Sequence, residues 1–281
     1  GVDYTATINS VLTGNTQLTK TDLGTLILGT SNTYAGGTAI NGGVLQVAEN
    51  SNLGDAAGNV SFNGGTLRTT ADFTIDRATE LQSAGGTIET TNATKLDYDG
   101  IVTGDGNLTK IGTGTLVLNG TNTYAGGTAI SAGVVQIASD ANLGSASGQL
   151  SIDGGTLHST ADISMNRSTT IGAGNATIET DTGTTLAQQG SIAGTGSLIK
   201  TGEGALVLTG TGAYSGGTTI ASGLLQLGDG GTSGSIVGDI ANNGTLAFNR
   251  SDALSFDSAI SGAGNVRQIG TGVTVLNKQS T

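Results

Sequence analysis

Short runs of alternating apolar and polar residues follow one another along the chain, and Gly, Asn or Asp bounds each run. Examples are VLQVA at 44–48, NVSFN at 59–63, TLRTT at 66–70, FTID at 73–76 and TELQS at 79–83. A period of two over such short runs is typical of strands with one buried face. No segment shows the 3.6-residue period of an amphipathic helix. The pattern therefore predicts an all-β fold built from many short strands.

These runs belong to a repeat of 90 residues. Residues 20–47, 110–137 and 200–227 read KTDLGTLILGTSNTYAGGTAINGGVLQV, KIGTGTLVLNGTNTYAGGTAISAGVVQI and KTGEGALVLTGTGAYSGGTTIASGLLQL. A truncated fourth copy, QIGTGVTVL, begins at Gln268, which is closer to Lys200 than a full repeat would place it. We expect full superrepeats at 20–109 and 110–199, and a truncated one at 200–267.

A smaller unit recurs inside each superrepeat. GGVLQ, GGTLR, GGTIE, GNLTK and AGVVQ begin at positions 42, 64, 85, 106 and 132, in steps of 22, 21, 21 and 26. The truncated superrepeat is shorter than the others by one such step, because 268 − 200 = 68 and 90 − 68 = 22. Loss of a whole unit is tolerated in a solenoid, where each coil contacts only its neighbours. We therefore expect a right-handed parallel β-helix with about 22 residues per coil and about 12–13 coils, a rod of roughly 60 Å at ~4.8 Å per strand.

The alternation also predicts which side chains point into the solenoid. Leu116 and Leu118 should lie inside, as should Val135 and Ile137, and each should stack on its equivalent one coil away. Nothing along the chain resembles a linker. We expect a single β-helical domain over residues 1–281.

The composition narrows the function classes. The chain has 281 residues with 50 Gly and no Pro, Cys or Trp, and its net charge is −11. Without cysteine, disulfide scaffolds, zinc ribbons and thiol enzymes are excluded. The absence of proline and of a Gly-X-Y register excludes collagen. An acidic chain is unsuited to nucleic acid or to anionic membrane surfaces. We expect no nucleic-acid partner and no cofactor.

The run GTGTLVLNGTNTYAGGTAISAGVVQIASDANLGSASG at 112–148 resembles the autotransporter-associated β-strand repeat, also called the passenger-associated transport repeat. The likeness extends to GTLILGTSNTYAGGTAINGGVLQVAENSNLG and GALVLTGTGAYSGGTTIASGLLQL. The resemblance implies the passenger of a monomeric Gram-negative autotransporter, secreted or displayed on the cell surface. It also implies a C-terminal translocator barrel in the full-length protein. Since the sequence starts without Met or an apolar signal region, we expect a fragment of a longer passenger.

The resemblance leaves several functions open. The first hypothesis is a β-helical stalk that supports outer-membrane export and presents an adhesive or self-associating surface. Its partners would be a host-cell surface protein or glycan, or other passengers. The second is a secreted virulence ligand or toxin that acts on a host-cell receptor. A polysaccharide-acting β-helical enzyme is a third, less favoured hypothesis, and we expect no enzyme.

One pair of carboxylates stands outside the repeat. In KLDYDG at 95–100, alternation places Asp97 and Asp99 on the outer face, and their counterparts 90 residues later are Ala187 and Gln189. Paired carboxylates serve glycoside hydrolysis when they flank a cleft, and nothing in the sequence indicates a cleft. We interpret the pair as solvated surface, with a cation or glycan contact as the alternative.

Three tyrosines recur with the repeat. Tyr34, Tyr124 and Tyr214 lie in NTYAGG-type motifs and should stack four coils apart. They form either a packed corner with hydrogen-bonded hydroxyls or a stripe of exposed aromatic rings.

The remaining candidates are polar positions that recur every 90 residues. Asp72 and Asp162 match, as do Arg77 and Arg167 and the pair Glu89 and Glu179. Recurrence favours a structural role such as turn capping by Asp, with anion binding at Arg77 as the alternative. His158, the only histidine, replaces Arg68 in register and has no Cys or second His nearby in the sequence. We interpret His158 as surface and predict no metal site.

Overall fold

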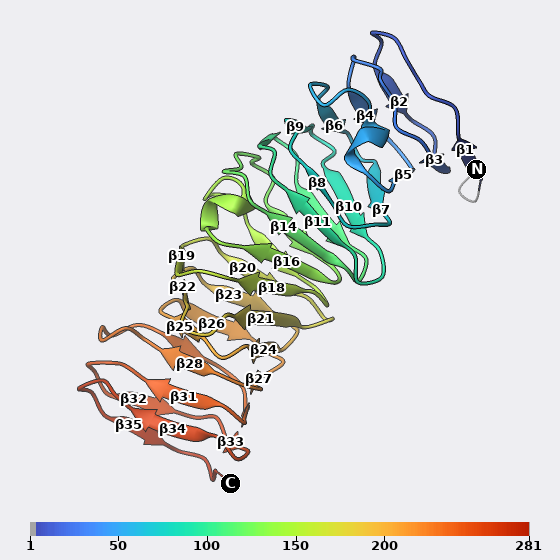
Figure 1. Cartoon of the computed structure of the whole chain (residues 1–281). Coiled ribbons are helices and arrows are strands. Elements are labelled where there is room, and N and C mark those ends of the chain that lie inside the picture. Colours follow the sequence, from blue (N-terminus) through green and yellow to red (C-terminus); the bar gives the residue numbers. More distant parts are fainter. Residues whose placement is uncertain (1–3, 281) are drawn as a thin grey trace. The chain divides into compact units, whose positions relative to one another are not determined.

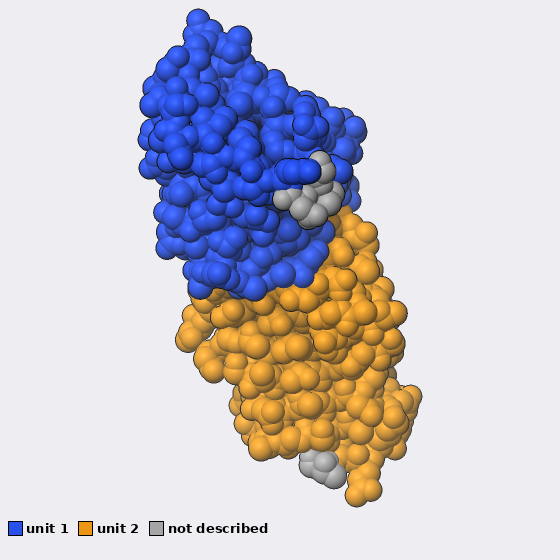
Figure 2. All heavy atoms as spheres, turned by 90° about the vertical axis from the view of Figure 1, so that its right-hand side faces the viewer, with its two compact units in different colours: residues 1–136, 141–148 blue, residues 137–140, 149–281 orange. Residues whose placement is uncertain are grey.

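The computed structural model (Figure 1) describes residues 4–280, which form two compact units (Figure 2). Unit 1 comprises residues 1–136 and 141–148, and unit 2 comprises residues 137–140 and 149–281. Each unit is a parallel β-solenoid, and together they contain about 13 turns of about 21 residues. The prediction of a parallel β-helix is therefore confirmed, whereas a single domain over 1–281 stays a prediction.

The strands that begin in the described part of unit 1 are β1 (Thr5–Ile8), β2 (Leu18–Lys20), β3 (Thr25–Leu28), β4 (Thr38–Ile40), β5 (Val44–Val47), β6 (Val60–Phe62), β7 (Thr66–Thr69), β8 (Phe73–Ile75), β9 (Thr79–Leu81), β10 (Gly86–Thr90), β11 (Lys95–Tyr98), β12 (Val102–Gly104), β13 (Leu108–Ile111), β14 (Thr115–Leu118), β15 (Thr128–Ile130) and β16 (Val134–Ile137). They lie in three parallel sheets, ordered β1-β3-β5-β7-β10-β13-β15, β2-β4-β6-β9-β12 and β8-β11-β14-β16. We call these the β1 sheet, the β2 sheet and the β8 sheet.

The strands of unit 2 are β17 (Leu150–Ile152), β18 (Thr156–Ser159), β19 (Ile163–Met165), β20 (Thr169–Ile171), β21 (Ala176–Thr180), β22 (Thr185–Gln188), β23 (Ile192–Gly194), β24 (Leu198–Thr201), β25 (Ala205–Leu208), β26 (Thr211–Tyr214), β27 (Thr218–Ile220), β28 (Leu224–Leu227), β29 (Ser235–Ile236), β30 (Ile240–Asn242), β31 (Thr245–Phe248), β32 (Leu254–Phe256), β33 (Ile260–Ser261), β34 (Asn265–Gln268) and β35 (Thr274–Leu276). The orders are β17-β20-β23-β26-β29, β18-β21-β24-β27-β30-β33, β19-β22-β25-β28-β31-β34 and β32-β35. Residues 4–280 contain no α-helix and two short 3₁₀ turns, η1 (Asn50–Leu53) and η2 (Asp140–Leu143).

The core is made of stacked columns of inward side chains. In the β1 sheet, Leu45, Leu67 and Ile88 lie directly above one another, and each is at most 1 % exposed. The inward positions predicted from alternation are confirmed, because Leu116, Leu118, Val135 and Ile137 are all buried. Each column repeats the same packing from turn to turn, which is why a period of two in the sequence suffices to specify it.

The 90-residue repeat does not coincide with a whole number of turns. In the β2 sheet, Leu18 stacks through Thr38, Val60 and Thr79 on Val102, which is four turns away. The repeat counterpart of Leu18 is Leu108, which lies in β13, one strand beyond the strand of Val102. Accordingly, the strand with Lys20 belongs to the β2 sheet and the strand with Lys110 to the β1 sheet. Equivalent residues of the first two superrepeats therefore face different sides of unit 1.

Candidate functional site

Of the two carboxylates that depart from the repeat, Asp97 lies on the outer face of β11 and Asp99 directly follows that strand, where it is exposed. Leu96 and Tyr98 point inward and are buried. Asp97 forms an ion pair with Lys95 at 3.1 Å, and Asp99 accepts a hydrogen bond from the Asn119 amide at 2.7 Å. Each carboxylate thus has its own partner on the protein, and the geometry is that of a solvated surface rather than of an acid/base pair facing a cleft.

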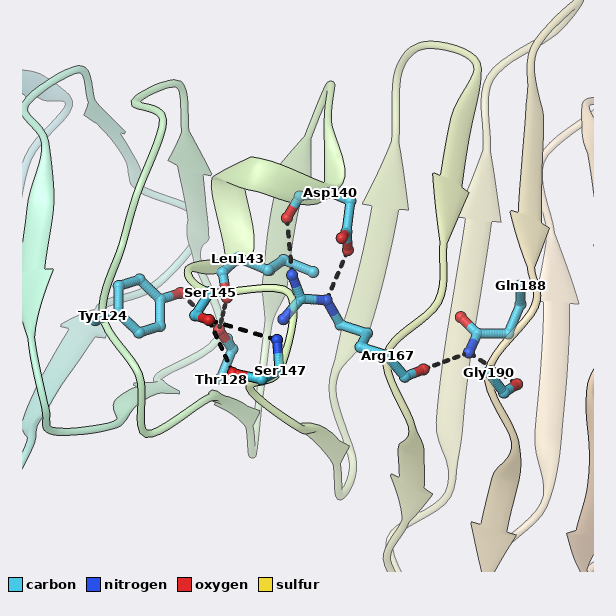
Figure 3. A network of polar contacts seen from close by, with 9 residues as sticks. All are labelled: Tyr124, Thr128, Asp140, Leu143, Ser145, Ser147, Arg167, Gln188 and Gly190. Atoms are coloured by element: carbon cyan, nitrogen blue, oxygen red, sulfur yellow. Dashed lines mark hydrogen bonds and ion pairs between the residues drawn. The ribbon is translucent and has the colours of Figure 1, made fainter.

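The recurring tyrosines are buried, so the alternative of an exposed aromatic stripe is wrong. Tyr34, Tyr124 and Tyr214 are at most 3 % exposed. Their hydroxyls lie 2.7, 2.6 and 2.7 Å from the hydroxyls of Thr38, Thr128 and Thr218, each four residues later in the chain; Figure 3 draws the second pair. Desolvation raises the pKa of Tyr214 to about 12 and also raises that of Tyr34. The three tyrosines therefore fill packed corners of the solenoid.

The expected stacking of Tyr34 on Tyr124 is also wrong. The Tyr34 segment hydrogen-bonds to Gly14 on one side and Asp55 on the other. The Tyr124 segment instead continues the β2 sheet, since the Ala125 amide donates to the Gly104 carbonyl at 2.9 Å. The two rings occupy different sides of unit 1 because a 90-residue step contains one strand more than four full turns.

Arg77 is a structural clamp and not an anion site. Arg77 is 3 % exposed, and its guanidinium donates to the carbonyls of Leu53, Asp55 and Gly58 at 3.2, 2.9 and 3.0 Å. In unit 2, Arg167 is buried in the same way and donates to the Asp140 carboxylate at 2.6 Å (Figure 3). The guanidinium therefore satisfies the carbonyls of the loop that contains the 3₁₀ turn.

The recurring aspartates have a structural role, but their hydrogen bonds run to the next turn of the solenoid and not to the turn in which each Asp lies. Asp72 accepts a hydrogen bond from the Lys95 amide at 2.7 Å, and Asp162 accepts one from the Thr185 amide at 2.8 Å. Both bonds connect one turn of the solenoid to the next, 23 residues later. The carboxylates thus fix the start of the following strand.

His158, interpreted from the sequence as a surface residue, is partly buried and pairs with a carboxylate. Its Nε2 lies 2.8 Å from a carboxylate oxygen of Asp181. In unit 1, Arg68 occupies the equivalent position and pairs with Glu89 at 2.8 Å. Among residues 4–280 no group of three His, Cys, Asp or Glu residues is arranged to hold a metal ion.

Each superrepeat begins with a buried lysine that was not among the residues predicted to be functional or structural. Lys110 and Lys200 are fully buried and Lys20 nearly so. The Lys110 ammonium donates to the carbonyls of Ile111 and Gly112 at 2.7 and 2.8 Å, and to that of Ala132 in the next turn at 3.3 Å. Burial lowers the pKa of Lys110 and of Lys200 to about 8.

A glycine makes room for each ammonium. A Cβ added to Gly133 would lie 2.8 Å from the Lys110 nitrogen and 2.4 Å from two backbone carbonyl oxygens, and its φ is +67°. The same close approach occurs between Gly43 and Lys20 and between Gly223 and Lys200. The signal for this arrangement was present in the sequence, because alternation places Lys110 on the same inward face as Leu108.

The chain is similar to known autotransporter proteins. The family model described as the passenger-associated-transport-repeat matches residues 18–47, 108–137 and 198–227. The protein named "Adhesin BmaC autotransporter", from Brucella suis biovar 1 (strain 1330), is 44 % identical over 166 residues. The match covers 59 % of this chain but only 5 % of that relative's length. No solved structure matches, and no helix among residues 4–280 is long and apolar enough to cross a membrane.

Proposed function

We propose that this chain, a β-solenoid with three passenger-associated-transport repeats, forms part of the stalk of an autotransporter passenger. In this role it is secreted or displayed on the bacterial surface after export with the help of a translocator domain, and it presents an adhesive or self-associating surface. The observation that carries the proposal is the threefold repeat, which supplies the buried lysine, tyrosine and glycine corners of the fold. The relative's name, which describes an adhesin, supports the adhesive part.

The structure is suited to export as an unfolded chain. Its backbone hydrogen bonds run almost entirely to the turn before or after, about 20 residues away. Each turn can therefore complete its pairing as soon as its neighbour is in place, without waiting for distant parts of the chain. The chain has no cysteine, so no disulfide has to form during export.

An adhesive surface is favoured over a hydrolytic one. Asp97 and Asp99, the carboxylates closest to a catalytic pair in the sequence, each have a partner on the protein. If the chain nevertheless hydrolysed a polysaccharide, the variants Asp97→Asn and Asp99→Asn would abolish depolymerisation. We expect neither the wild type nor the variants to depolymerise polysaccharides.

The test measures binding of the purified chain to cultured host cells and to itself across a salt series. Saturable cell binding, or self-association, is the expected result. Cell binding that weakens with salt would indicate a charged contact surface. Absence of both kinds of binding would contradict the adhesive role. A cellular response at concentrations far below saturation would instead favour a secreted ligand or toxin.

A further inference from the structure

The outer face of the β2 sheet contains a polar groove. The middle outward residues of its strands lie in register as Thr19, Ala39, Ser61, Glu80 and Thr103. Ser61 is small, and beside it the face is hollowed into a cavity of about 350 Å³ that Asn59, Glu80 and Thr103 also line. That volume lies within the range of small-molecule sites, about 300–1,000 Å³. We call this feature the β2-sheet groove.

The walls of the β2-sheet groove carry amides, hydroxyls and one carboxylate, with no basic or aromatic side chain. The polar side chains that are not buried are those of Gln17, Asn59, Ser61, Glu80, Gln82 and Thr103. Within residues 4–280, Thr103 donates to the Thr79 carbonyl at 3.2 Å, and the other five side chains form no hydrogen bond or ion pair. Elsewhere in unit 1 the outward carboxylate of Glu89 is held by Arg68 at 2.8 Å. The carboxylate of Glu80 remains available to a ligand.

Two polar residues of the β2-sheet groove, Glu80 and Thr103, are not kept in the 90-residue repeat, whereas Gln17, Asn59 and Ser61 are matched by Asn107, Gln149 and Ser151. Ninety residues after Glu80 the chain has Thr170, and ninety after Thr103 it has Ala193. Both replacements occupy the equivalent strands, β20 and β23, of unit 2. The solenoid therefore folds without a carboxylate at the position of Glu80 and without a hydroxyl at the position of Thr103, so the repeated fold requires neither group.

We propose that the β2-sheet groove binds a neutral saccharide, with Glu80 and the flanking amides as its hydrogen-bonding groups. Sugar hydroxyls both donate and accept hydrogen bonds, which matches amides that do the same and a carboxylate that accepts. A sulfated or otherwise anionic saccharide would meet Glu80 and a chain of net charge −11 with no basic residue in the groove. The proposal rests on the adhesive role proposed above, because it names the class of ligand.

The test uses the whole chain. Its substitutions replace Glu80 and Thr103 by the residue types found at the equivalent positions of unit 2, Thr170 and Ala193. Binding of a panel of neutral di- to tetrasaccharides built from mannose, galactose or N-acetylglucosamine is measured by saturation-transfer NMR and calorimetry. A sulfated heparin oligosaccharide and an oligolysine peptide are measured alongside them. The variant Glu80→Thr/Thr103→Ala should lose at least tenfold in affinity for the saccharide that binds. The control Asp97→Asn, outside the groove, should bind as the wild type does.

Each result bears on the proposal. Binding of a neutral saccharide that the double variant loses and the control keeps supports it. The proposal is overturned if no neutral saccharide binds, if the double variant binds unchanged, or if the heparin oligosaccharide or oligolysine binds the groove more tightly. Cell adhesion of the same proteins separates the two levels. If the double variant still adheres to cells, the groove is not the adhesive site, but the adhesive role of the chain is kept. If the chain binds a saccharide but neither cells nor itself, the adhesive role is contradicted, but the saccharide site is kept.

Discussion

The buried lysines predict an unusual dependence of stability on pH. We consider Lys110→Met, which keeps most of the side-chain volume and removes the ammonium. Burial lowers the pKa of Lys110 from its usual 10.5 to about 8, while the neighbouring Glu89 acts in the opposite direction. Below pH 8 both the folded and the unfolded chain carry the proton, so the cost of burying the charge is present in full.

The sign and size of the effect follow from proton linkage. Between pH 8 and 10.5 the folded chain has released the proton and the unfolded chain still holds it, so the free energy of unfolding rises with pH. At pH 9.5 the folded lysine is about 1.5 pH units past its pKa, which corresponds to about 2 kcal/mol. Solvent screening at the turn reduces the expected gain from pH 7 to 9.5 to about 1–2 kcal/mol. Lys110→Met should lack this gain.

Urea denaturation followed by circular dichroism at pH 7 and 9.5 measures the effect. The control is Lys95→Met, which removes an exposed lysine whose ammonium pairs with Asp97. We expect Lys95→Met to follow the wild type and Lys110→Met to show a smaller gain with pH. If the wild type and Lys110→Met gain equally, the buried ammonium does not titrate in this range and the reasoning fails.

Three further substitutions test the packing. Leu118→Asp puts a carboxylate at a position 1 % exposed and should cost about 4 kcal/mol or more, so an unchanged thermal melting temperature would refute its inward placement. Tyr124→Phe removes the hydroxyl that lies 2.6 Å from Thr128 and should cost about 1 kcal/mol in urea denaturation; no loss would show that the corner does not need the bond. Asp72→Ala removes the acceptor of the Lys95 amide and should cost about 1 kcal/mol, with faster hydrogen exchange at that amide; unchanged exchange would contradict that structural role.

Strands and core columns could be predicted because both depend on a local pattern. The period of two places Leu116 and Leu118 inside without any knowledge of what they touch. Residues 44–48 were expected to form a strand, and β5 spans Val44–Val47. The spacing of the repeated unit indicated the length of a turn, since strands in register must be one turn apart.

Contacts that depend on the phase between repeat and turn could not be predicted in this way. The unequal steps of 22, 21, 21 and 26 contained the signal, since the long step includes the strand that advances each superrepeat around the coil. Reading the repeat as four whole turns placed Tyr34 above Tyr124, which is wrong. The ammonium of Lys110 likewise donates a hydrogen bond to the carbonyl of Ala132, one turn later. A charged side chain is expected on the surface unless such a buried partner is known, so the sequence alone does not predict this burial.

In a solenoid, recurrence and departure from the repeat carry different information. Each superrepeat has the same corners to fill, so residues that recur are expected to have a packing role. Tyr34 and Tyr124 are examples, and both are buried. A departure alone is not a site, because Asp97 departs from the repeat and is held by Lys95. Glu80 departs from the repeat, has no partner among residues 4–280 and borders a hollow that Asn59 and Ser61 also line. Whether an unusual residue also lacks a partner and borders a hollow depends on which residues of neighbouring turns lie beside it, and this is known only from the folded chain. For this reason the β2-sheet groove should be tested before Asp97 and Asp99.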